Sequence, residues 1–376
     1  MSKTRTFILQ QYGITYRKGK NMIKDKKKFP ENDVKAILKL YGFDTIFSEQ
    51  REYINHHEEY GWNVKVVLSV LLENGQRVVI KIVNGKGDNM LKEREKTEKQ
   101  STFSAFMRQN GIITPKCYMS NGRYCNEYVY NDFLCNVTVE DWCGEEITEI
   151  NTELSYKIGE LMARMHILSL NNNYEIGCET LFSAAHQNDV DAYEDFCKIC
   201  ENECLDKVVI EQIKKHRNEK LAAIRAVWDK LPKAAVQGDI SINNLAYGNE
   251  VLTVFDYNNA GDVVLVSDLV LEGLLTAYEM NLPKGIDQSV REQFFPALLK
   301  GYLSVRQLSE EEADIAWSIY TLYHSLWFSR IKYNEDSLEK LVKNEDYLSA
   351  NRLLVQMLAD ITESDDGRFR KCCTKN

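Results

Sequence analysis

Apolar and polar residues recur with two different periods in the first part of the chain, and together they predict a helix followed by a hairpin. Residues 30–41 place apolar side chains at helical spacing before a glycine, which is typical of a short amphipathic helix. Lys65–Leu72 and Arg77–Val83 are rich in β-branched residues, which predicts two strands. The pair Asn74-Gly75 between these strands is a strong hairpin signal.

A second group of elements follows the hairpin. The charged segment 89–110 predicts a helix, because a glycine and then a proline follow it closely. Short strands are expected at 116–119, 126–130 and 134–140, where β-branched and aromatic residues gather. Strands on both sides of one helix in the sequence predict a small α+β layer.

Beyond residue 142 the pattern becomes mainly helical. Residues 153–170 are predicted to form an amphipathic helix, and Ser309 with Glu312 predicts a capping box ahead of a long, aromatic-rich helix. One β-type island at 234–255 interrupts this part of the chain. Every segment after that island is predicted to be helical.

These elements predict an α+β fold with a small antiparallel-sheet lobe and a larger, mostly helical lobe, separated by a cleft. The chain has 376 residues, of which 44% are hydrophobic, enough for one large domain or two smaller ones. We expect a basic N-terminal tail at 1–29, a sheet-bearing lobe at 30–141 and a helical lobe at 142–376.

The charge distribution changes the expected partners. The chain has 47 Lys and Arg against 56 Asp and Glu, a net charge of −9, which argues against general binding of nucleic acids. Residues 1–28 alone hold nine Lys or Arg and one Asp, so their charge of +8 leaves −17 for the remainder. We interpret this basic segment as a solvated tail; a surface-binding arm, or sequence upstream of a later start at Met22, are the alternatives.

Two absences bear on the location of the protein. No apolar run approaches the roughly 20 residues that span a membrane. No secretory leader precedes the ten cysteines, which favours reduced thiols and a cytoplasmic protein without a membrane partner. The sequence makes no prediction about the oligomeric state.

The β island brings together residues suited to phosphoryl transfer. An apolar strand leads into Gly238-Asp239, Asn244 follows five residues after that aspartate, and a second apolar strand ends at Asp256. Transfer of a phosphoryl group needs a carboxylate that accepts the proton of the attacking hydroxyl, and oxygen ligands that hold Mg²⁺ against the phosphates. Taken singly, these three residues are ordinary turn or capping residues.

This stretch resembles the HGDxxxxN…DF signature of the aminoglycoside phosphotransferase/choline kinase family, which has the protein-kinase-like fold. The resemblance implies that Asp239 is the catalytic base and that Asn244 and Asp256 are the metal ligands. It also implies that Asp268 braces the catalytic loop. Gln237 stands where the family has histidine, and we interpret it as structural support for the loop, because an amide cannot become cationic.

The resemblance extends to the nucleotide side and covers roughly residues 32–330. Lys81 would bind the α- and β-phosphates, and Glu98 on the following helix would pair with Lys81, with Glu95 as its rival. The hinge that binds adenine through its backbone would lie around 139–144. The residues implied for nucleotide binding are therefore Lys81, Glu98, Asn63, Glu140, Asp141 and Trp142. An exposed strand lysine and a solvated helix glutamate are the plainer interpretations of Lys81 and Glu98.

The acceptor substrate is expected to bind in the helical lobe. Aromatic residues recur at helical spacing between 317 and 327, a pattern that either packs in the core or encloses a small substrate. The candidates for contact with the substrate are Tyr323, His324 and Trp327. Abundant acidic residues in this lobe favour a cationic substrate, such as an aminoglycoside or an amino alcohol.

The sequence thus predicts a phosphotransferase that uses ATP or GTP with Mg²⁺ and phosphorylates a hydroxyl of a small molecule. The alternative is a kinase-like binding or structural protein that has lost catalysis, which the glutamine at 237 motivates.

Overall fold

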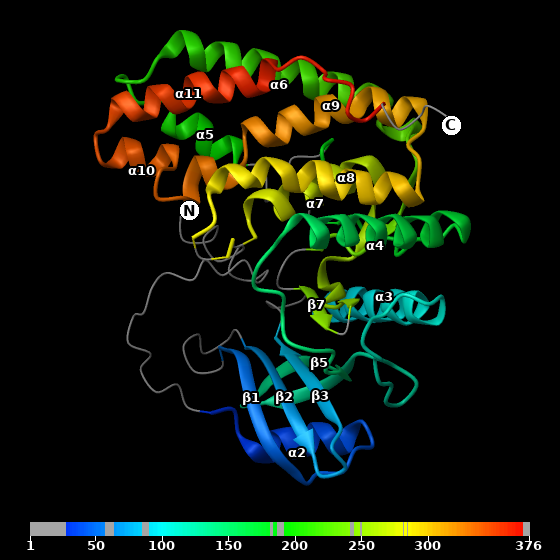
Figure 1. Cartoon of the computed structure of the whole chain (residues 1–376). Coiled ribbons are helices and arrows are strands. Elements are labelled where there is room, and N and C mark those ends of the chain that lie inside the picture. The colour runs from blue at the N-terminus through cyan, green and yellow to red at the C-terminus, as the bar shows by residue number, and fades with distance from the viewer. Residues whose placement is uncertain are drawn as a thin grey trace. The chain divides into compact units, whose positions relative to one another are not determined.

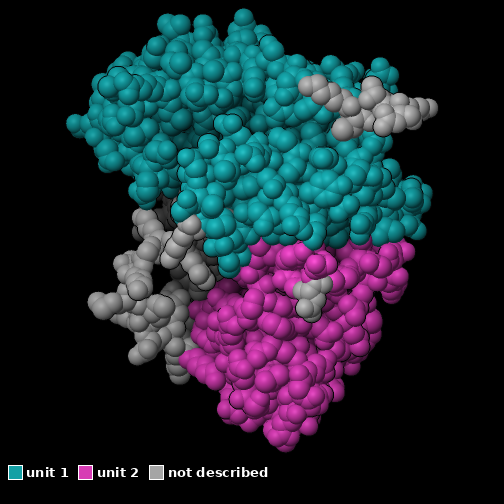
Figure 2. All heavy atoms as spheres, in the orientation of Figure 1, with its two compact units in different colours: residues 1–12, 148–243, 261–376 teal, residues 13–147, 244–260 magenta. Residues whose placement is uncertain are grey.

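The computed structural model describes residues 28–56, 64–84, 90–180, 183–185, 192–240, 244–248, 250–280, 282–283 and 285–370. The chain divides into two compact units, which Figure 2 distinguishes by colour. The sheet unit comprises the described residues within 28–147 and 244–260. The helical unit comprises the described residues within 148–243 and 261–370.

A five-stranded antiparallel sheet of order β1-β2-β3-β5-β4 forms the centre of the sheet unit (Figure 1). Its strands are β1 (Phe47–His56), β2 (Lys65–Leu72), β3 (Arg77–Val83), β4 (Asn126–Tyr130) and β5 (Phe133–Asp141). The predicted β2–β3 hairpin is confirmed, and Gly75 in its turn has a φ of +83°, which glycine adopts without strain. The polar edge strand β1 has no counterpart in the sequence prediction.

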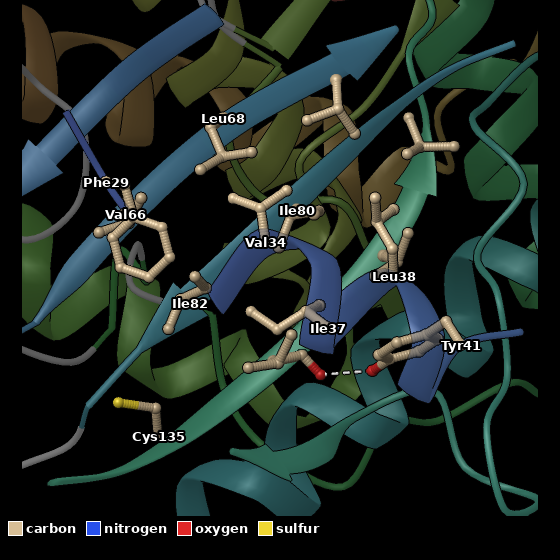
Figure 3. Close-up of a cluster of buried hydrophobic side chains, with 14 of the residues drawn as sticks. Phe29, Val34, Ile37, Leu38, Tyr41, Val66, Leu68, Ile80, Ile82 and Cys135 are labelled. Carbon is tan, nitrogen blue, oxygen red and sulfur yellow. Dashed lines mark hydrogen bonds between the residues drawn. The ribbon is translucent and has the colours of Figure 1, made fainter. Parts of the chain in front are cut away.

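The two faces of this sheet have different environments, because successive side chains of a strand point to opposite sides. One face packs against α2 (Glu31–Leu40) and forms a core that includes Val66, Leu68, Ile80 and Ile82 (Figure 3). Helix α2 contributes Val34, Ile37 and Leu38 to this core. The alternate residues of β2 and β3, Lys81 among them, therefore belong to the other face.

A distant part of the sequence completes the sheet unit. The hairpin β7 (Leu245–Gly248) and β8 (Val251–Val254) joins the segment after β5, where Ile147 N donates to Leu245 O at 2.8 Å. Helix α3 (Met90–Gln109) binds the chain beyond this hairpin, since Gln100 Nε2 donates to Asn258 O at 2.6 Å and to Ala260 O at 3.0 Å.

The helical unit contains most of the C-terminal elements (Figure 1). Its α-helices are α4 (Thr152–Asn171), α5 (Tyr193–Ile199), α6 (Lys207–Val227), α7 (Leu265–Tyr278), α8 (Phe294–Val305), α9 (Glu310–Ser325), α10 (Leu338–Lys343) and α11 (Tyr347–Thr362). The predicted capping box is confirmed at the start of α9, where Ser309 and Glu312 bind each other's backbone N–H. No described helix is both long and apolar enough to cross a membrane.

One sequence prediction for this unit is wrong. Gly261–Val264 is not helical but forms strand β9, which pairs antiparallel with β6 (Lys233–Val236). Its apolar residues continue directly into those of α7, so periodicity alone does not separate strand from helix. Asp262 of this strand accepts the backbone N–H groups of Ile176 at 2.8 Å and Gly177 at 2.7 Å, which ties the pair to the chain after α4.

Helices α4 and α8 cross with their backbones in contact. A Cβ atom at Gly159 would lie 2.0 Å from Leu298 O, and one at Gly301 would lie 2.0 Å from Tyr156 O. Each helix therefore needs a glycine where the other passes over it. The expected α+β fold, with an antiparallel sheet in the N-terminal part and helices in the C-terminal part, is confirmed.

Candidate active site

Lys81 lies between two carboxylates on the sheet face that α2 does not cover. Its Nζ is 2.8 Å from Glu140 Oε1 and 3.4 Å from Asp256 Oδ1. The side chains of Lys81 and Glu140 are only 12% and 14% exposed, whereas that of Asp256 is 36% exposed. Residues from β3, β5 and the end of the β7–β8 hairpin thus converge on one ammonium group.

The opposite charges in this cluster stabilise one another and offset the cost of burying each charged group. Burial opposes the charge of Lys81, but the carboxylates of Asp256 and Glu140 offset it and raise the pKa of Lys81. Burial raises the pKa of Glu140, and the charge and hydrogen bond of Lys81 counteract that shift. Lys81 is therefore a cation fixed in position near neutral pH.

The expected pair of Lys81 with Glu98 is corrected by the structure. Glu98 accepts the backbone N–H of Tyr124 at 3.1 Å and that of Cys125 at 2.7 Å, so its two carboxylate oxygens hold the start of β4. Its rival Glu95 is exposed on the same helix. The partners of Lys81 come instead from a neighbouring strand and a hairpin, which the helical spacing of α3 does not reveal.

The two predicted metal ligands flank the base of the β7–β8 hairpin. Asn244 is buried directly before β7, and its carbonyl accepts the N–H of Phe255 at 2.9 Å. Asp256 follows Phe255 and has a φ of +55°, a left-handed conformation that few non-glycine residues adopt. Such backbone conformations concentrate at functional sites. The structure thus brings together the two chain segments that carry the amide and the carboxylate.

A second lysine, which the sequence prediction missed, lies on the same sheet face. Lys65 pairs with Val83 and Val67 pairs with Lys81 across β2 and β3, so the two lysines are diagonal neighbours. Burial lowers the pKa of Lys65, the charge of Asp256 raises it, and the charge of Lys81 lowers it. The alternation of β2 together with its register against β3 is the signal that identifies this residue.

Asp239 and Gln237 belong to the helical unit, in the loop after β6. Gly238 between them has a φ of +77°, and the Asp239 N–H donates to Gln237 Oε1 at 2.8 Å. Asp239 is 8% exposed. Gln237 therefore supports the backbone of the loop through its amide oxygen, the kind of contact that a neutral side chain provides.

A buried chain of polar groups starts at Asp268 on α7. Asp268 Oδ2 is 3.0 Å from His166 Nε2, and His166 Nδ1 is 2.9 Å from the hydroxyl of Tyr302. Arg306 donates to the same hydroxyl at 3.0 Å and to both carboxylate oxygens of Glu312 at 2.9 Å. This chain connects helices α4, α7, α8 and α9 through side chains that are almost fully buried.

A further buried acid on α7 lies close to this chain and to the loop. Glu272 is completely buried, and burial raises its pKa well above the ordinary value. The negative charges of Asp268 and Asp239 raise it further. Burial therefore favours the protonated form of Glu272, a residue that the sequence prediction did not identify.

The predicted hinge residues are already engaged in the sheet unit. The N–H of Asp141 donates to Lys116 O at 2.9 Å, and the N–H of Trp142 donates to Arg77 O at 3.0 Å. The Trp142 indole donates to the hydroxyl of Tyr53 at 3.1 Å. Adenine binding by this segment stays a prediction. The backbone N–H groups of Asp141 and Trp142 cannot donate to adenine while they donate to these carbonyl oxygens. Asn63 lies outside the described residues.

Most of the aromatic stripe of α9 packs in the core of the helical unit. Trp317 donates to Glu363 O at 2.9 Å, and Arg368 lies 4.9 Å from the ring centre of Trp317. The indole of Trp327 is buried and donates to Glu279 Oε1 at 2.6 Å. Core packing therefore explains much of the periodicity, because the C-terminal segment covers this side of the helix.

His324 and Tyr323 are the half-buried members of the predicted acceptor set. The His324 ring stacks on that of Tyr320, with 5.4 Å between centroids, and lies 5.2 Å from that of Tyr278. Burial lowers the pKa of His324 to about 4, so this imidazole is neutral at pH 7. Roles for Tyr323, His324 and Trp327 in substrate binding stay predictions.

No protein-family model and no curated protein matches the sequence. Solved structures do match the fold. A microcompartment-associated aminopropanol kinase is similar with a TM-score of 0.59 and 13% identity, over 88% of this chain and 98% of that chain. Amicoumacin kinase in complex with AMP-PNP, Ca²⁺ and Ami has a TM-score of 0.54 and 15% identity, over 83% of this chain and 92% of that chain.

An aminoglycoside phosphotransferase from Alicyclobacillus acidocaldarius has a TM-score of 0.53 and 11% identity, over 91% of this chain and 98% of that chain. At sequence identities this low, the structural similarity establishes the fold alone. The chain has the fold of small-molecule kinases and phosphotransferases, as the resemblance in its sequence predicted.

Proposed function

We propose that the protein is a phosphotransferase that uses ATP, or GTP, with Mg²⁺ to phosphorylate a hydroxyl of a small molecule, as a member of the aminoglycoside phosphotransferase/choline kinase family. The observation that carries this proposal is the position of Lys81 between Glu140 and Asp256, with Asp256 next to the hairpin that Asn244 begins. A largely buried cation beside a more exposed carboxylate suits the phosphates of a nucleotide and their metal ion.

The nucleotide binds on the open face of the sheet in this proposal. Val67 and Val79 lie on that face, half-buried, in the same strands as Lys65 and Lys81. They offer an apolar platform for the base, while Lys81 attracts the α- and β-phosphates. Residues 30–141 are accordingly the proposed nucleotide-binding lobe, and 142–376 the lobe with the catalytic loop and the acceptor site.

Mg²⁺ fits the donor set of Asn244 and Asp256. The described residues contain no group of three or more His, Cys, Asp or Glu placed to hold a metal, so a tight all-protein site is not formed by them. Mg²⁺ is usually held by one or two carboxylates together with water and phosphate oxygens, which these two residues match. When bound, the ion neutralises charge on the phosphates.

Asp239 is the proposed base. Its carboxylate orients the acceptor hydroxyl and takes its proton as the oxygen attacks the γ-phosphorus. The new O–P bond forms while the bond between the γ-phosphorus and the bridging oxygen breaks, and the nucleoside diphosphate leaves with that electron pair. Gln237 holds the N–H of Asp239, and Asp268 with His166 braces the helical unit behind the loop.

The proposed acceptor is a cationic alcohol, such as an aminoglycoside or an amino alcohol. Outside residues 1–28 the chain carries a net charge of −17, which raises the local concentration of cations. The structural relatives above are named for aminopropanol, amicoumacin and aminoglycosides. The eight described cysteines are free thiols, which supports a reducing compartment and hence the cytoplasm.

A screen for phosphate transfer tests this function. Purified protein is incubated with ATP or GTP, Mg²⁺ and panels of aminoglycosides, amino alcohols, sugars and nucleosides, and both the nucleoside diphosphate and the phosphorylated acceptor are measured. We expect transfer to at least one amine-bearing alcohol, and none with Asp239→Asn. Nucleotide binding without transfer to any acceptor would favour the alternative of a kinase-like binding protein. No binding of nucleotide at millimolar concentration would contradict the proposal.

A further inference from the structure

We propose that Glu140 on β5, rather than a residue of helix α3, is the positioning residue that holds Lys81 ready for the phosphates of the nucleotide. This inference rests on the proposed function, since it assigns the orientation of the phosphate-binding lysine. It differs from the role that the sequence suggested for Glu140, which was adenine binding through the backbone of a hinge.

The register of the sheet explains the contact. Lys81 is opposite Thr138 across β3 and β5, and Glu140 is opposite Val79, so Lys81 and Glu140 are diagonal neighbours on one face. Such neighbours have Cβ atoms roughly 7–8 Å apart, which long side chains bridge. The 2.8 Å ion pair therefore requires only the pairing of two adjacent strands.

The other carboxylates near this site have different tasks. Glu98 uses both of its oxygens to accept the backbone N–H groups of Tyr124 and Cys125. Asp256 is at 3.4 Å from Lys81 and is the most exposed of the three groups in the cluster. A metal ion on Asp256 would compete with Lys81 for the Asp256 oxygens, whereas Glu140, whose side chain is only 14% exposed, remains paired with the lysine.

The ion pair with Glu140 holds Lys81 in position before any nucleotide binds. Because Lys81 and Glu140 belong to adjacent strands of one sheet, Lys81 is oriented without any movement of α3. The lysine is then preorganised before the nucleotide arrives, and no conformational equilibrium of the helix reduces the apparent affinity.

The affinities for ATP, ADP and adenosine distinguish this role from a merely structural one. They are measured by calorimetry on the full chain as wild type, Glu140→Gln, Glu140→Asp and Glu98→Gln. We expect Glu140→Gln to weaken ATP and ADP binding about tenfold and to leave adenosine binding unchanged, because only the phosphates contact Lys81. Glu140→Asp, which keeps the charge on a shorter side chain, should recover part of the loss. Glu98→Gln should lower the unfolding temperature and leave the affinity for ATP unchanged.

Each contrary outcome has its own meaning. Equal weakening of adenosine and ATP by Glu140→Gln would show a general disturbance of the sheet and overturn the inference. Weaker ATP binding in Glu98→Gln alone would return the role to the helix. A wild-type protein that binds ATP, with Glu140→Gln binding it equally well, would overturn the inference and leave the proposed function intact. No ATP binding by the wild type would remove both.

A double-mutant cycle supplies a readout that needs no nucleotide. The unfolding free energies of Lys81→Met, Glu140→Gln and the double variant give the coupling between these two side chains. The same cycle with Glu98→Gln is the matched control. We expect coupling in the first cycle and none in the second; coupling in the second cycle alone would overturn the pairing itself.

Discussion

The imidazole of His166 bridges Asp268 and Tyr302, with Nε2 3.0 Å from Asp268 Oδ2 and Nδ1 2.9 Å from the Tyr302 hydroxyl. His166 is therefore held at both nitrogens inside the helical unit, which supports a structural role for this residue. The chain continues through Arg306 to Glu312, so four helices depend on one continuous set of buried hydrogen bonds.

Tyr302→Phe tests the importance of this chain. The substitution removes one hydroxyl and leaves buried nitrogens of His166 and Arg306 without their partner, which costs about 1–3 kcal/mol in such cases. Urea unfolding followed by circular dichroism measures the change. Tyr347→Phe at the half-buried start of α11 is the control and should change stability by less than about 0.5 kcal/mol. Equal stability of both variants would mean that the chain contributes nothing.

Asp239→Asn should abolish most of the phosphate transfer. Loss of a general base reduces turnover by about 10²- to 10⁴-fold, while the affinity for ATP should stay within a factor of about two because the amide keeps the shape of the side chain. Steady-state kinetics and calorimetry measure the two quantities separately. A variant with undiminished turnover would show that Asp239 is not the base.

Asp256→Asn should raise the concentration of Mg²⁺ needed for half-maximal activity by at least about tenfold, because a neutral amide is a weaker ligand for a hard cation. A titration of activity with Mg²⁺ measures this, after removal of metal with a chelator has abolished activity in both proteins. Asn244→Ala should shift the same curve in the same direction. Curves that coincide with that of the wild type would place the metal elsewhere.

Glu272→Gln should stabilise the protein increasingly as the pH rises. The buried acid loses its proton at a higher pH in the folded chain than in the unfolded chain, where its pKa is near the ordinary value of 4.5. Between these two pKa values the folded state binds more protons, so the wild type loses stability as the pH rises. Glutamine has no proton to lose. The difference in unfolding free energy between variant and wild type should therefore grow as the pH rises above about 4.5. A difference that does not change with pH would show that the pKa of Glu272 is not raised in the folded chain.

Gly159→Ala should destabilise the helical unit by about 3 kcal/mol, since the new methyl group would overlap the carbonyl oxygen of Leu298 and force α4 and α8 apart. Thermal and urea unfolding measure the loss. Gly248→Ala is the control, because an added Cβ there meets no atom within 4 Å. Similar stability of the two variants would mean that the helices separate at little cost.

Local patterns predicted the elements whose signals lie within a few residues. The β2–β3 hairpin follows from strand alternation and Asn74-Gly75, and the start of α9 follows from Ser309 and Glu312. Strand β1 was not predicted because its residues are mostly polar, which is common in an edge strand with one side exposed to solvent. Strand β9 was not predicted because it has only four residues and its two valines run directly into the apolar residues of α7, so it shows no period of its own.

The site divides in the same way. The spacing of Asp239, Asn244 and Asp256 indicated phosphoryl transfer, because these residues lie close together in the sequence. The partner of Lys81 was predicted on the nearest helix, whereas it lies on β5, 59 positions further along the chain. Glu272 and Lys65 were not identified, since nothing local marks a glutamate as buried or a strand lysine as facing a carboxylate.

By itself, the amino-acid order determined the succession of strands and helices, the hairpin turn, the helix cap and the candidate loop, because each depends on backbone preferences and side chains close in sequence. Only the tertiary structure decided which carboxylate pairs with Lys81, which acid on α7 has a pKa raised by burial, and which aromatic rings of α9 are covered by the C-terminal segment. Those outcomes depend on strand register and burial, which arise when segments distant along the chain pack together.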